Sequence, residues 1–326
     1  MKHSIEPQVG NWLALENVHL GDSAELLHRI APESISLSVW SPPYHVGKEY
    51  EKGQTFLEWQ KMLRDVISAH LRILKPGGFC VINIADILCF PDENMPRIQA
   101  ETLSSRRITL TKEEILVAIS ELGTTNRDVI AKHFGVSEQT IDRRLKGNNI
   151  RGGKYHSQTR VKTVAGMIEE FAQDSGLYLY DRRVWVKDAA WANSRWASSS
   201  YRAVDEFEYV FFLWKPGVTK VDRSRLTSQE WVEWGSRAVW NIPSVRANDN
   251  HEAKFPIELP LRIIQLLTDP GDVVLDPFSG SGTSLVAAVQ LGRTPIGIDL
   301  TPEYVKMGNQ AIKKATSQPI QAKLPI

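Results

Sequence analysis

The sequence predicts an α/β fold in which two separated stretches of chain form one mostly parallel sheet, with a small helical module inserted between them. Three observations support this prediction. Short apolar runs typical of buried strands alternate with amphipathic helices near both ends of the chain. The pattern changes at about residue 91, where prolines interrupt a polar stretch. Residues 111–146 are then helical in pattern and contain no proline.

The segment before residue 90 predicts two strands with a helix between them. Residues 35–40 are an apolar run that ends at a Ser-Pro-Pro sequence, so we expect a buried strand that leads into a rigid turn. Apolar residues recur at helical spacing over 56–74, and the Lys-Pro-Gly-Gly sequence at 75–78 is a helix stop signal. Residues 78–84 predict the next buried strand.

After the insert, the chain returns to strands and helices. A strand, a crossover helix and a second strand near the C-terminus predict a right-handed parallel unit. Residues 215–250 predict mostly irregular structure. The expected strands are 177–186, 207–214, 272–277 and 294–300; the expected helices are 255–267, with Pro256 in its first turn, and the helix within 278–293, after a glycine-rich turn.

Composition narrows the class of protein. The chain has 326 residues, of which 42% are hydrophobic and 24% charged, so it can bury a core of useful size. The two cysteines, Cys80 and Cys89, have no CxxC spacing and predict buried reduced thiols. No run approaches the ~18 apolar residues of a membrane span, and the N-terminus lacks a signal-peptide pattern. We therefore expect a cytoplasmic protein.

A glycine-rich motif occupies residues 276–283, between a predicted strand and a predicted helix. Nucleotide-like ligands bind at such strand ends, and Gly280 and Gly282 allow the backbone to approach a ligand closely. Asp299 ends the following strand, at a distance from Asp276 close to the ~20 residues expected of a ribose-binding acid. Taken alone, the motif also fits a dinucleotide enzyme or a simple tight turn.

A second motif is the tetrapeptide Ser41-Pro42-Pro43-Tyr44. The two prolines fix the backbone, so a hydroxyl, a carbonyl and an aromatic ring project together from a strand end. This set can hold a planar ring that bears an amine, with two acceptors for the N–H groups and one face for stacking. Taken alone, it also fits a proline-rich turn that closes a strand.

Together the two motifs resemble the β group of DNA amino-methyltransferases, which methylate the N4 amine of cytosine or the N6 amine of adenine. In that family the tetrapeptide is Asp/Asn/Ser-Pro-Pro-Tyr/Phe and precedes the loop Asp-Pro-Phe-x-Gly-Ser-Gly-Thr. The resemblance covers roughly residues 15–90 and 177–316. Two departures are Glu252, where the family usually has proline, and Ser284, where a second threonine is common.

The resemblance implies a Rossmann-like, S-adenosylmethionine-dependent methyltransferase sheet with helices on both faces. We expect residues 1–95 and 166–326 to form the catalytic domain and residues 96–165 to form an inserted helix-turn-helix module. Asp22 is expected near the adenine and Asp299 at the ribose hydroxyls of the cofactor. The other implied cofactor-binding residues are Lys254, Phe255 and Pro256, at the methionine end, and Asp276, Pro277, Phe278, Ser279, Gly280, Ser281, Gly282 and Thr283.

The resemblance also implies that the target base leaves the duplex, because its amine lies within the stack. Tyr44 would stack on this base, while Ser41 and the carbonyl of Pro42 would accept hydrogen bonds from the amine. Such acceptors favour a pyramidal nitrogen whose lone pair can point at the methyl group, in a site that aligns the two. Serine at the first position resembles the N4-cytosine enzymes, whereas aspartate occurs mostly in the N6-adenine enzymes.

Four alternatives to N4-cytosine methylation remain to be compared with the sequence. The first alternative is N6-adenine methylation, and a further alternative is a non-catalytic DNA-binding regulator on the same fold. An RNA methyltransferase is disfavoured because A-form RNA hides its major groove from a helix. Methylation at carbon 5 of cytosine needs a Pro-Cys nucleophile, whereas Cys80 follows Phe79 and Cys89 follows Leu88.

The insert predicts a DNA contact. Ala131, Gly135, Val136 and Ile141 fall at the positions of a helix-turn-helix, and Ser137 is placed to cap its second helix. Residues 106–162 contain 12 Lys and Arg against 6 Asp and Glu, a net charge of +6, while the whole chain carries +1. A structural insert with a solvated basic face is the alternative. The predicted DNA-binding residues are Glu138, Gln139, Thr140, Arg143, Arg144 and Lys146, with Arg195 and Arg202 from a Trp/Arg-rich stretch that equally fits aromatic packing.

The expected partners follow from this interpretation. They are double-stranded DNA and, as a candidate, a cognate restriction endonuclease. We expect no contact with a membrane, and a chain that acts as a monomer or dimer. His45, His156 and His251 show no metal-ligand spacing, so we expect no metal.

Overall fold

The computed structural model describes residues 12–44, 54–87, 98–99, 109–146, 156–157, 161–188, 203, 205–245 and 255–318. The chain divides into two compact units. The first consists of residues 1–88, 161–190 and 205–326, and the second of residues 89–160 and 191–204. The division into catalytic and inserted domains expected from the sequence stays a prediction.

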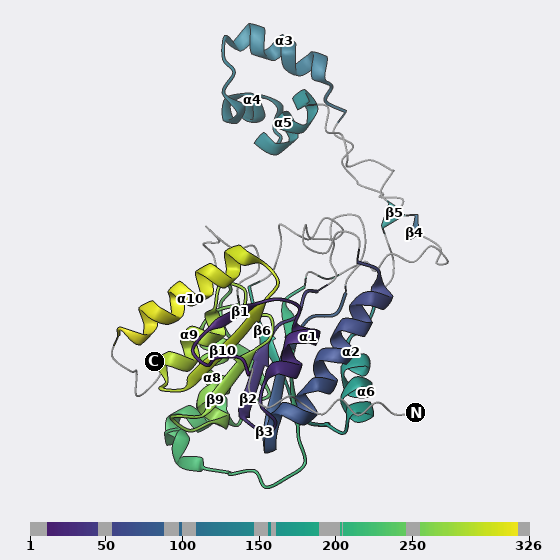
Figure 1. The fold of residues 1–326 in the computed structure, drawn as a ribbon. Coiled ribbons are helices and arrows are strands. Elements are labelled where there is room, and N and C mark those ends of the chain that lie inside the picture. Colours follow the sequence, from purple (N-terminus) through teal and green to yellow (C-terminus); the bar gives the residue numbers. More distant parts are fainter. Residues whose placement is uncertain are drawn as a thin grey trace. The chain divides into compact units, whose positions relative to one another are not determined.

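An eight-stranded sheet forms the centre of the first unit (Figure 1), in the order β1-β10-β9-β2-β3-β7-β6-β8. Strand β7 is antiparallel to both of its neighbours, and the other pairs are parallel. The expected mixed, mostly parallel sheet is therefore confirmed. Its strands are β1 (Val18–Leu20), β2 (Ile35–Trp40), β3 (Leu74–Ile84), β6 (Tyr178–Val186), β7 (Phe207–Trp214), β8 (Val239–Asn241), β9 (Val273–Asp276) and β10 (Thr294–Asp299).

The two central strands come from distant parts of the sequence. Strand β2 pairs in parallel with β9, with Ser38 opposite Leu275. From this pair the chain winds in opposite directions: β2 leads through α2 (Phe56–Ile73) to β3, and β9 leads through α9 (Thr283–Gln290) to β10. Right-handed crossovers in opposite directions place their helices on opposite faces of a sheet and open a crevice at the carboxyl ends of the strands between them.

The alternation of side chains along strand β2 fits a strand that is buried on both faces of the sheet. Leu37 and Val39 belong to a core cluster that contains residues of α8 (Glu258–Leu267) and α9. Ser38 points to the other face, where its Oγ lies 2.8 Å from Nε2 of His70 in α2. Because successive side chains of a strand point to opposite faces, both faces must be covered by helices. The remaining helices of the first unit include α1 (Ser23–Leu26), α6 (Ala165–Ser175) and α10 (Pro302–Thr316) (Figure 1).

One local expectation was wrong. Helix α8 begins at Glu258, so Pro260 lies in its first turn and Pro256 precedes it. The region 215–250, expected to be mostly irregular, contains short elements among its described residues: a helix, α7 (Ser228–Glu230), a π-helical turn, η5 (Trp231–Gly235), and the edge strand β8, which pairs with β6. Three residues are too short to show a period in the sequence, so only the neighbouring strand defines β8.

The second unit contains three helices among its described residues: α3 (Lys112–Leu122), α4 (Arg127–Phe134) and α5 (Glu138–Lys146). It also contains the paired strands β4 (Ile98–Gln99) and β5 (His156–Ser157). The helices bury a small core of their own, formed by Leu110, Ile115, Ile130, Ala131 and Ile141. Across both units, no described helix is long and apolar enough to cross a membrane.

Candidate active site

The two sequence motifs lie next to each other at the carboxyl ends of β2 and β9. The parallel pairing of Ser38 with Leu275 brings the residues that follow these strands to the same edge of the sheet. The ring of Trp40, the last residue of β2, packs on the ring of Phe278 with 5.2 Å between centroids. This is the crevice where the strand order reverses, and open α/β sheets bind their ligands there.

Backbone hydrogen bonds hold the glycine-rich loop against β10. The amide of Ser279 donates to the carbonyl of Ile298 at 3.0 Å, and the amide of Gly280 donates to Oδ2 of Asp299 at 2.8 Å. The other carboxylate oxygen, Oδ1, accepts the amide of Thr301 at 2.9 Å. Asp299 is half-buried, so its carboxylate is fixed at the end of β10 and is still partly accessible. A carboxylate in this position can accept hydrogen bonds from ribose hydroxyls.

Gly282 is needed for a packing reason as well as a conformational one. Its φ is +88°, in the left-handed region that L side chains rarely adopt. A Cβ atom added there would lie 3.1 Å from Cα of Gly308 in α10. The loop therefore turns directly against the backbone of α10, and α9 begins at the next residue.

Asp276 lies beneath the loop. It is 2% exposed, its Oδ1 accepts the amide of Phe278 at 2.9 Å, and its Oδ2 accepts the hydroxyl of Ser284. Burial raises the pKa of Asp276 to about 7, and the charge of Asp299 acts in the same direction, against the two hydrogen bonds. Asp276 therefore holds the two ends of the loop, at Phe278 and Ser284, by hydrogen bonds to its buried carboxylate. Ser284, a departure from the family pattern, supplies one of these two bonds.

Asp22 and its neighbour connect β1 to the same loop. The carboxylate of Asp22 accepts the amide of Ala24 at 2.7 Å and caps α1. The hydroxyl of Ser23 donates to the carbonyl of Pro277. The strand ends of β1, β9 and β10 thus place Asp22, the loop and Asp299 around one region of the first unit.

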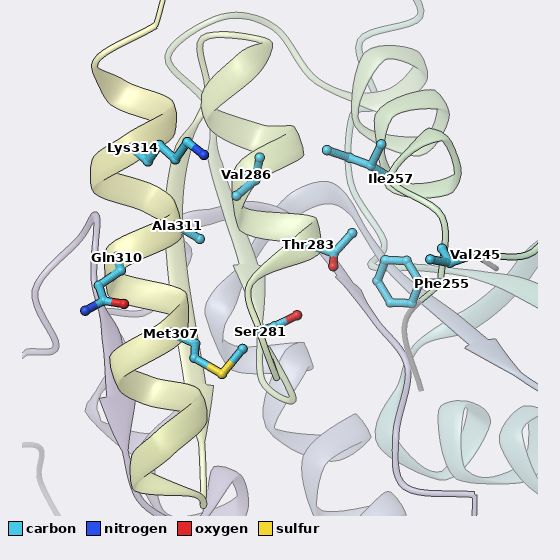
Figure 2. Close-up of a pocket in the computed structure, with 10 residues that line it drawn as sticks. All are labelled: Val245, Phe255, Ile257, Ser281, Thr283, Val286, Met307, Gln310, Ala311 and Lys314. Atoms are coloured by element: carbon cyan, nitrogen blue, oxygen red, sulfur yellow. The ribbon is translucent and has the colours of Figure 1, made fainter. Parts of the chain in front are cut away.

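A groove of about 720 Å³ lies beside the loop (Figure 2). Ser281 lines it from the glycine-rich loop, Thr283 from the start of α9, Phe255 from the segment that leads into α8, and Lys314 from α10. The structure thus brings three of the predicted cofactor-binding residues to one surface. Lys254 lies outside the described residues.

The tetrapeptide is held in place by helix α2. The indole N–H of Trp59 donates to the carbonyl of Pro43 at 2.7 Å. Among the described residues, no hydrogen-bond donor contacts the carbonyl of Pro42. One carbonyl therefore anchors the turn, and the other remains available to a ligand. The sequence pattern identified Trp59 only as an apolar residue of the helix.

The Tyr44 hydroxyl has a partner that sequence reasoning missed. It lies 2.8 Å from Oγ of Ser41 and 2.6 Å from Oε2 of Glu208 in β7. Glu208 is 7% exposed and forms an ion pair with Lys187, with 2.7 Å between Oε1 and Nζ. The available signal was a charged residue at the start of an otherwise apolar strand. Nearby, the side-chain oxygen of Asn83 is buried without a hydrogen-bond partner among the described residues.

Cys80 cannot act as a nucleophile in this site. It is fully buried in β3, and its sulfur accepts the indole N–H of Trp40 at 3.3 Å. Burial raises the pKa of the Cys80 thiol to about 12, although the Trp40 contact opposes the shift. Because the reactive form of cysteine is the thiolate, this geometry agrees with the argument against methylation at carbon 5 by Cys80. Cys89 lies outside the described residues.

The second unit carries the predicted DNA-binding helix. Gly135 ends α4 with a φ of +61°, and the hydroxyl of Ser137 accepts the amide of Thr140 at 3.3 Å as α5 begins. Arg127 of α4 pairs with Asp142 of α5 at 3.0 Å. Glu138 is exposed, and Thr140, Arg143 and Arg144 are half-buried, all on α5. The side chains of Gln139 and Lys146, together with Arg195 and Arg202, lie outside the described part of the chain.

Similarity to solved structures identifies the fold. TTHA0409 of Thermus thermophilus, solved with S-adenosylmethionine, is 22% identical with a TM-score of 0.58, over 92% of this chain and 94% of that chain. The structure described as PvuII DNA methyltransferase, cytosine-N4-specific, is 19% identical with a TM-score of 0.56, over 94% of this chain and 92% of that chain. The fold is that of the S-adenosylmethionine-dependent methyltransferases.

Sequence comparison gives the family. The N6/N4 methyltransferase family, described as DNA methylase, matches residues 35–310. The chain is 55% identical to the Type II methyltransferase M.BglI of Bacillus subtilis, over 93% of this chain and 87% of that protein. It is 26% identical to the DNA adenine methyltransferase YhdJ of Escherichia coli, over 91% of this chain and 82% of that protein. The chain therefore belongs to the N6/N4 DNA methylase family, as its motifs predicted, and its methyl donor is S-adenosylmethionine.

Proposed function

We propose that this chain methylates the exocyclic N4 amine of a cytosine flipped out of duplex DNA, as the modification enzyme of a Type II restriction-modification system. One observation carries the choice of base. A serine, Ser41, stands at the first tetrapeptide position, at the end of the strand that adjoins the cofactor loop. A neutral hydroxyl here resembles the N4-cytosine enzymes.

The proposed chemistry depends on how the target amine is held. Its lone pair is delocalised into the ring, so the amine is a weak nucleophile. Ser41 Oγ and the carbonyl of Pro42 accept its two N–H groups, and the ring of Tyr44 stacks on the base. These contacts favour a pyramidal nitrogen and direct its lone pair toward the cofactor. S-adenosylmethionine supplies, when bound, a methyl group on a positively charged sulfur.

The residues around the loop fit this cofactor. The Asp299 carboxylate is fixed by two backbone amides, which supports its proposed role as the acceptor for the ribose hydroxyls. We assign Asp22, which caps α1 at the end of β1, to the adenine of the cofactor. The left-handed turn at Gly282 supports a close approach of the loop to its ligand. Phe255, in the wall of the groove, belongs to the segment assigned to the methionine end.

A Type II setting is supported by relatedness. The protein that is 55% identical, M.BglI, is named a Type II methyltransferase. Such an enzyme protects the site that a restriction endonuclease cuts, so we propose a cognate endonuclease as the partner. The second unit, with its net positive charge and a tight turn between α4 and α5, is proposed as a helix-turn-helix module that contacts the DNA.

N6-adenine methylation is the second candidate. It is favoured by the similarity to YhdJ, a DNA adenine methyltransferase, over most of both chains. The same acceptors, Ser41 and Pro42, can hold an adenine amine, so the fold, cofactor and site would be unchanged.

Mass spectrometry of nucleosides separates these candidates. Mixed-sequence duplex DNA is incubated with the protein and S-adenosylmethionine, and we expect N4-methylcytosine. Ser41→Ala removes an acceptor that acts on the reacting amine, so the rate should fall roughly 100-fold. Ser68→Ala, which removes a hydroxyl from the outer side of α2, is the matched control and should leave the rate unchanged.

Other results would contradict the proposal in different ways. N6-methyladenine would keep the site and overturn the argument from serine. No methylated base, with the cofactor still bound, would support a regulator or an RNA substrate.

A further inference from the structure

A chain of hydrogen bonds connects the tetrapeptide to a buried charge. Oγ of Ser41 lies 2.8 Å from Oη of Tyr44, which lies 2.6 Å from Oε2 of Glu208. The other carboxylate oxygen of Glu208 lies 2.7 Å from Nζ of Lys187. The chain thus runs from the turn after β2 across the sheet to β7 and β6.

The carboxylate at one end fixes the direction of every donor. An ionised carboxylate only accepts hydrogen bonds, so Tyr44 must donate its single hydroxyl proton to Glu208. The oxygen of Tyr44 is then left as an acceptor, and Ser41 donates its own proton to it. The carbonyl of Asn83 also lies near Tyr44 Oη, but at 3.4 Å it is the weaker acceptor. The hydroxyl proton of Ser41 is therefore used in the hydrogen bond to Tyr44, and the lone pairs of the Ser41 oxygen are left to accept other hydrogen bonds.

Lys187 is the cationic partner of this buried carboxylate. The ammonium pairs with Glu208 at 2.7 Å and with Asp205 at 3.3 Å. Burial opposes the charge on Lys187, but the two carboxylates outweigh burial and hold the pKa of Lys187 above its usual value. A buried charge is stable only when it is paired, and here the pair stabilises the acceptor at the end of the chain.

The Tyr44 hydroxyl is not explained by base stacking. A phenylalanine ring would stack equally well, and the related tetrapeptides end in either tyrosine or phenylalanine. In this chain the hydroxyl connects Ser41 to Glu208, so it has a separate role.

We propose that Glu208 is a positioning residue which, through Tyr44, fixes the hydroxyl of Ser41 as a hydrogen-bond acceptor for the target amine. This inference rests on the proposed function, because that function assigns Ser41 its contact with the amine. Without the chain, the Ser41 hydroxyl is free to donate its proton toward the nitrogen, and that hydrogen bond would occupy the lone pair needed for methyl transfer. When the proton of Ser41 points at Tyr44, the Ser41 oxygen can only accept a hydrogen bond from the amine, and the lone pair of the nitrogen stays available.

The test measures three quantities on a duplex that contains the methylation site of the wild type. They are the single-turnover rate, the affinity for S-adenosylmethionine, and the emission of a fluorescent base analogue at the target position, which reports flipping. Tyr44→Phe keeps the ring and leaves the Glu208–Lys187 pair intact. We expect it to lower the rate about 10- to 100-fold, the effect of one hydrogen bond to a charged group, with flipping and cofactor affinity unchanged.

Glu208→Gln tests the same chain from its other end. The amide of glutamine can donate to Tyr44 and so reverse the direction of the chain, and we expect a similar loss of rate. The double variant should be no slower than the slower single variant, because both changes break one chain. Tyr209→Phe is the matched control: it removes a tyrosine hydroxyl next to another carboxylate, that of Asp86 at 3.5 Å, and should leave the rate unchanged.

The possible outcomes separate the two proposals. If the wild type transfers the methyl group and Tyr44→Phe transfers it at the same rate, this inference alone is overturned. A loss of flipping or cofactor affinity equal to the loss of rate would assign the chain a structural role, and additive losses in the double variant would show that Glu208 acts without Tyr44. A wild type that transfers no methyl group to DNA would overturn the proposed function and this inference with it.

Discussion

Replacement of Asp276 by asparagine should change how the stability of the first unit depends on pH. The buried carboxyl has a pKa of about 7, against an ordinary value of 3.8. Between these two values the folded chain keeps a proton that the unfolded chain has lost. The free energy of unfolding therefore falls as pH rises, until the folded carboxyl also ionises. Asparagine can accept from the amide of Phe278 and donate to Ser284, and it does not ionise.

The size of the effect follows from the shift in pKa. Each unit corresponds to about 1.4 kcal/mol, so a shift of roughly three units gives a total of about 4 kcal/mol. Stability contributed by the protonated carboxyl is fully present below about pH 4 and is lost as pH rises to about pH 7. Between about pH 5.5 and about pH 8, the wild type should therefore lose about 2 kcal/mol more than Asp276→Asn.

Urea denaturation followed by tryptophan fluorescence measures this difference. Trp40 packs on Phe278 and so reports on the core next to the loop. The quantity compared is the change in the free energy of unfolding between the two pH values. The change in the variant is subtracted from the change in the wild type, because other titrating groups contribute to both. Equal changes in the two proteins would refute the assignment of a raised pKa to Asp276.

Two further predictions concern the loop and the second unit. Gly282→Ala should destabilise the first unit by about 1–2 kcal/mol, because alanine is strained at this φ and its methyl group meets α10. It should also weaken S-adenosylmethionine binding, which calorimetry measures. Gly271 has a similar φ of +85° but open space around it, so Gly271→Ala is the control that isolates the effect of the contact with α10. Replacement of both Arg143 and Arg144 by alanine should weaken duplex binding and lower the slope of affinity against salt by about two. Lys132→Ala removes one positive charge from α4, outside the predicted DNA-binding helix, and should change the slope less. Equal slopes in the wild type and both variants would contradict a phosphate contact by α5.

Most of the first unit followed from local patterns. The run of apolar residues over β9, the glycines after it and the acid at the end of β10 are each visible in the sequence, because a buried parallel strand and a tight turn restrict residue type strongly. The tetrapeptide was equally visible, because its prolines fix the backbone by covalent geometry. The order of the two motifs and the break near residue 91 predicted that separated segments share one sheet, and the pairing of β2 with β9 confirmed it.

The edge strand and the buried acceptors were not predictable in this way. Strand β8 has three residues, and its identity depends on the pairing of Trp240 with Trp185 in β6. Asp276 was predicted among the cofactor-binding residues of its motif, and the burial of its carboxylate under the loop was not foreseen. Burial of this kind depends on how α9 and β10 close over the strand end, and no local pattern specifies that.

The sequence by itself therefore determined most of the sheet, the position of both motifs and the family, because residue spacing and backbone restriction act over a few neighbouring positions. Only the tertiary structure decided which side chains share a hydrogen bond. Tyr44 and Glu208 are separated by 164 positions, and their contact exists because β3 pairs with β7 and brings Ile84 opposite Tyr209. Register between distant strands is set by packing over the whole sheet, so it fixes the direction of the Ser41 hydroxyl in a way that no local pattern encodes.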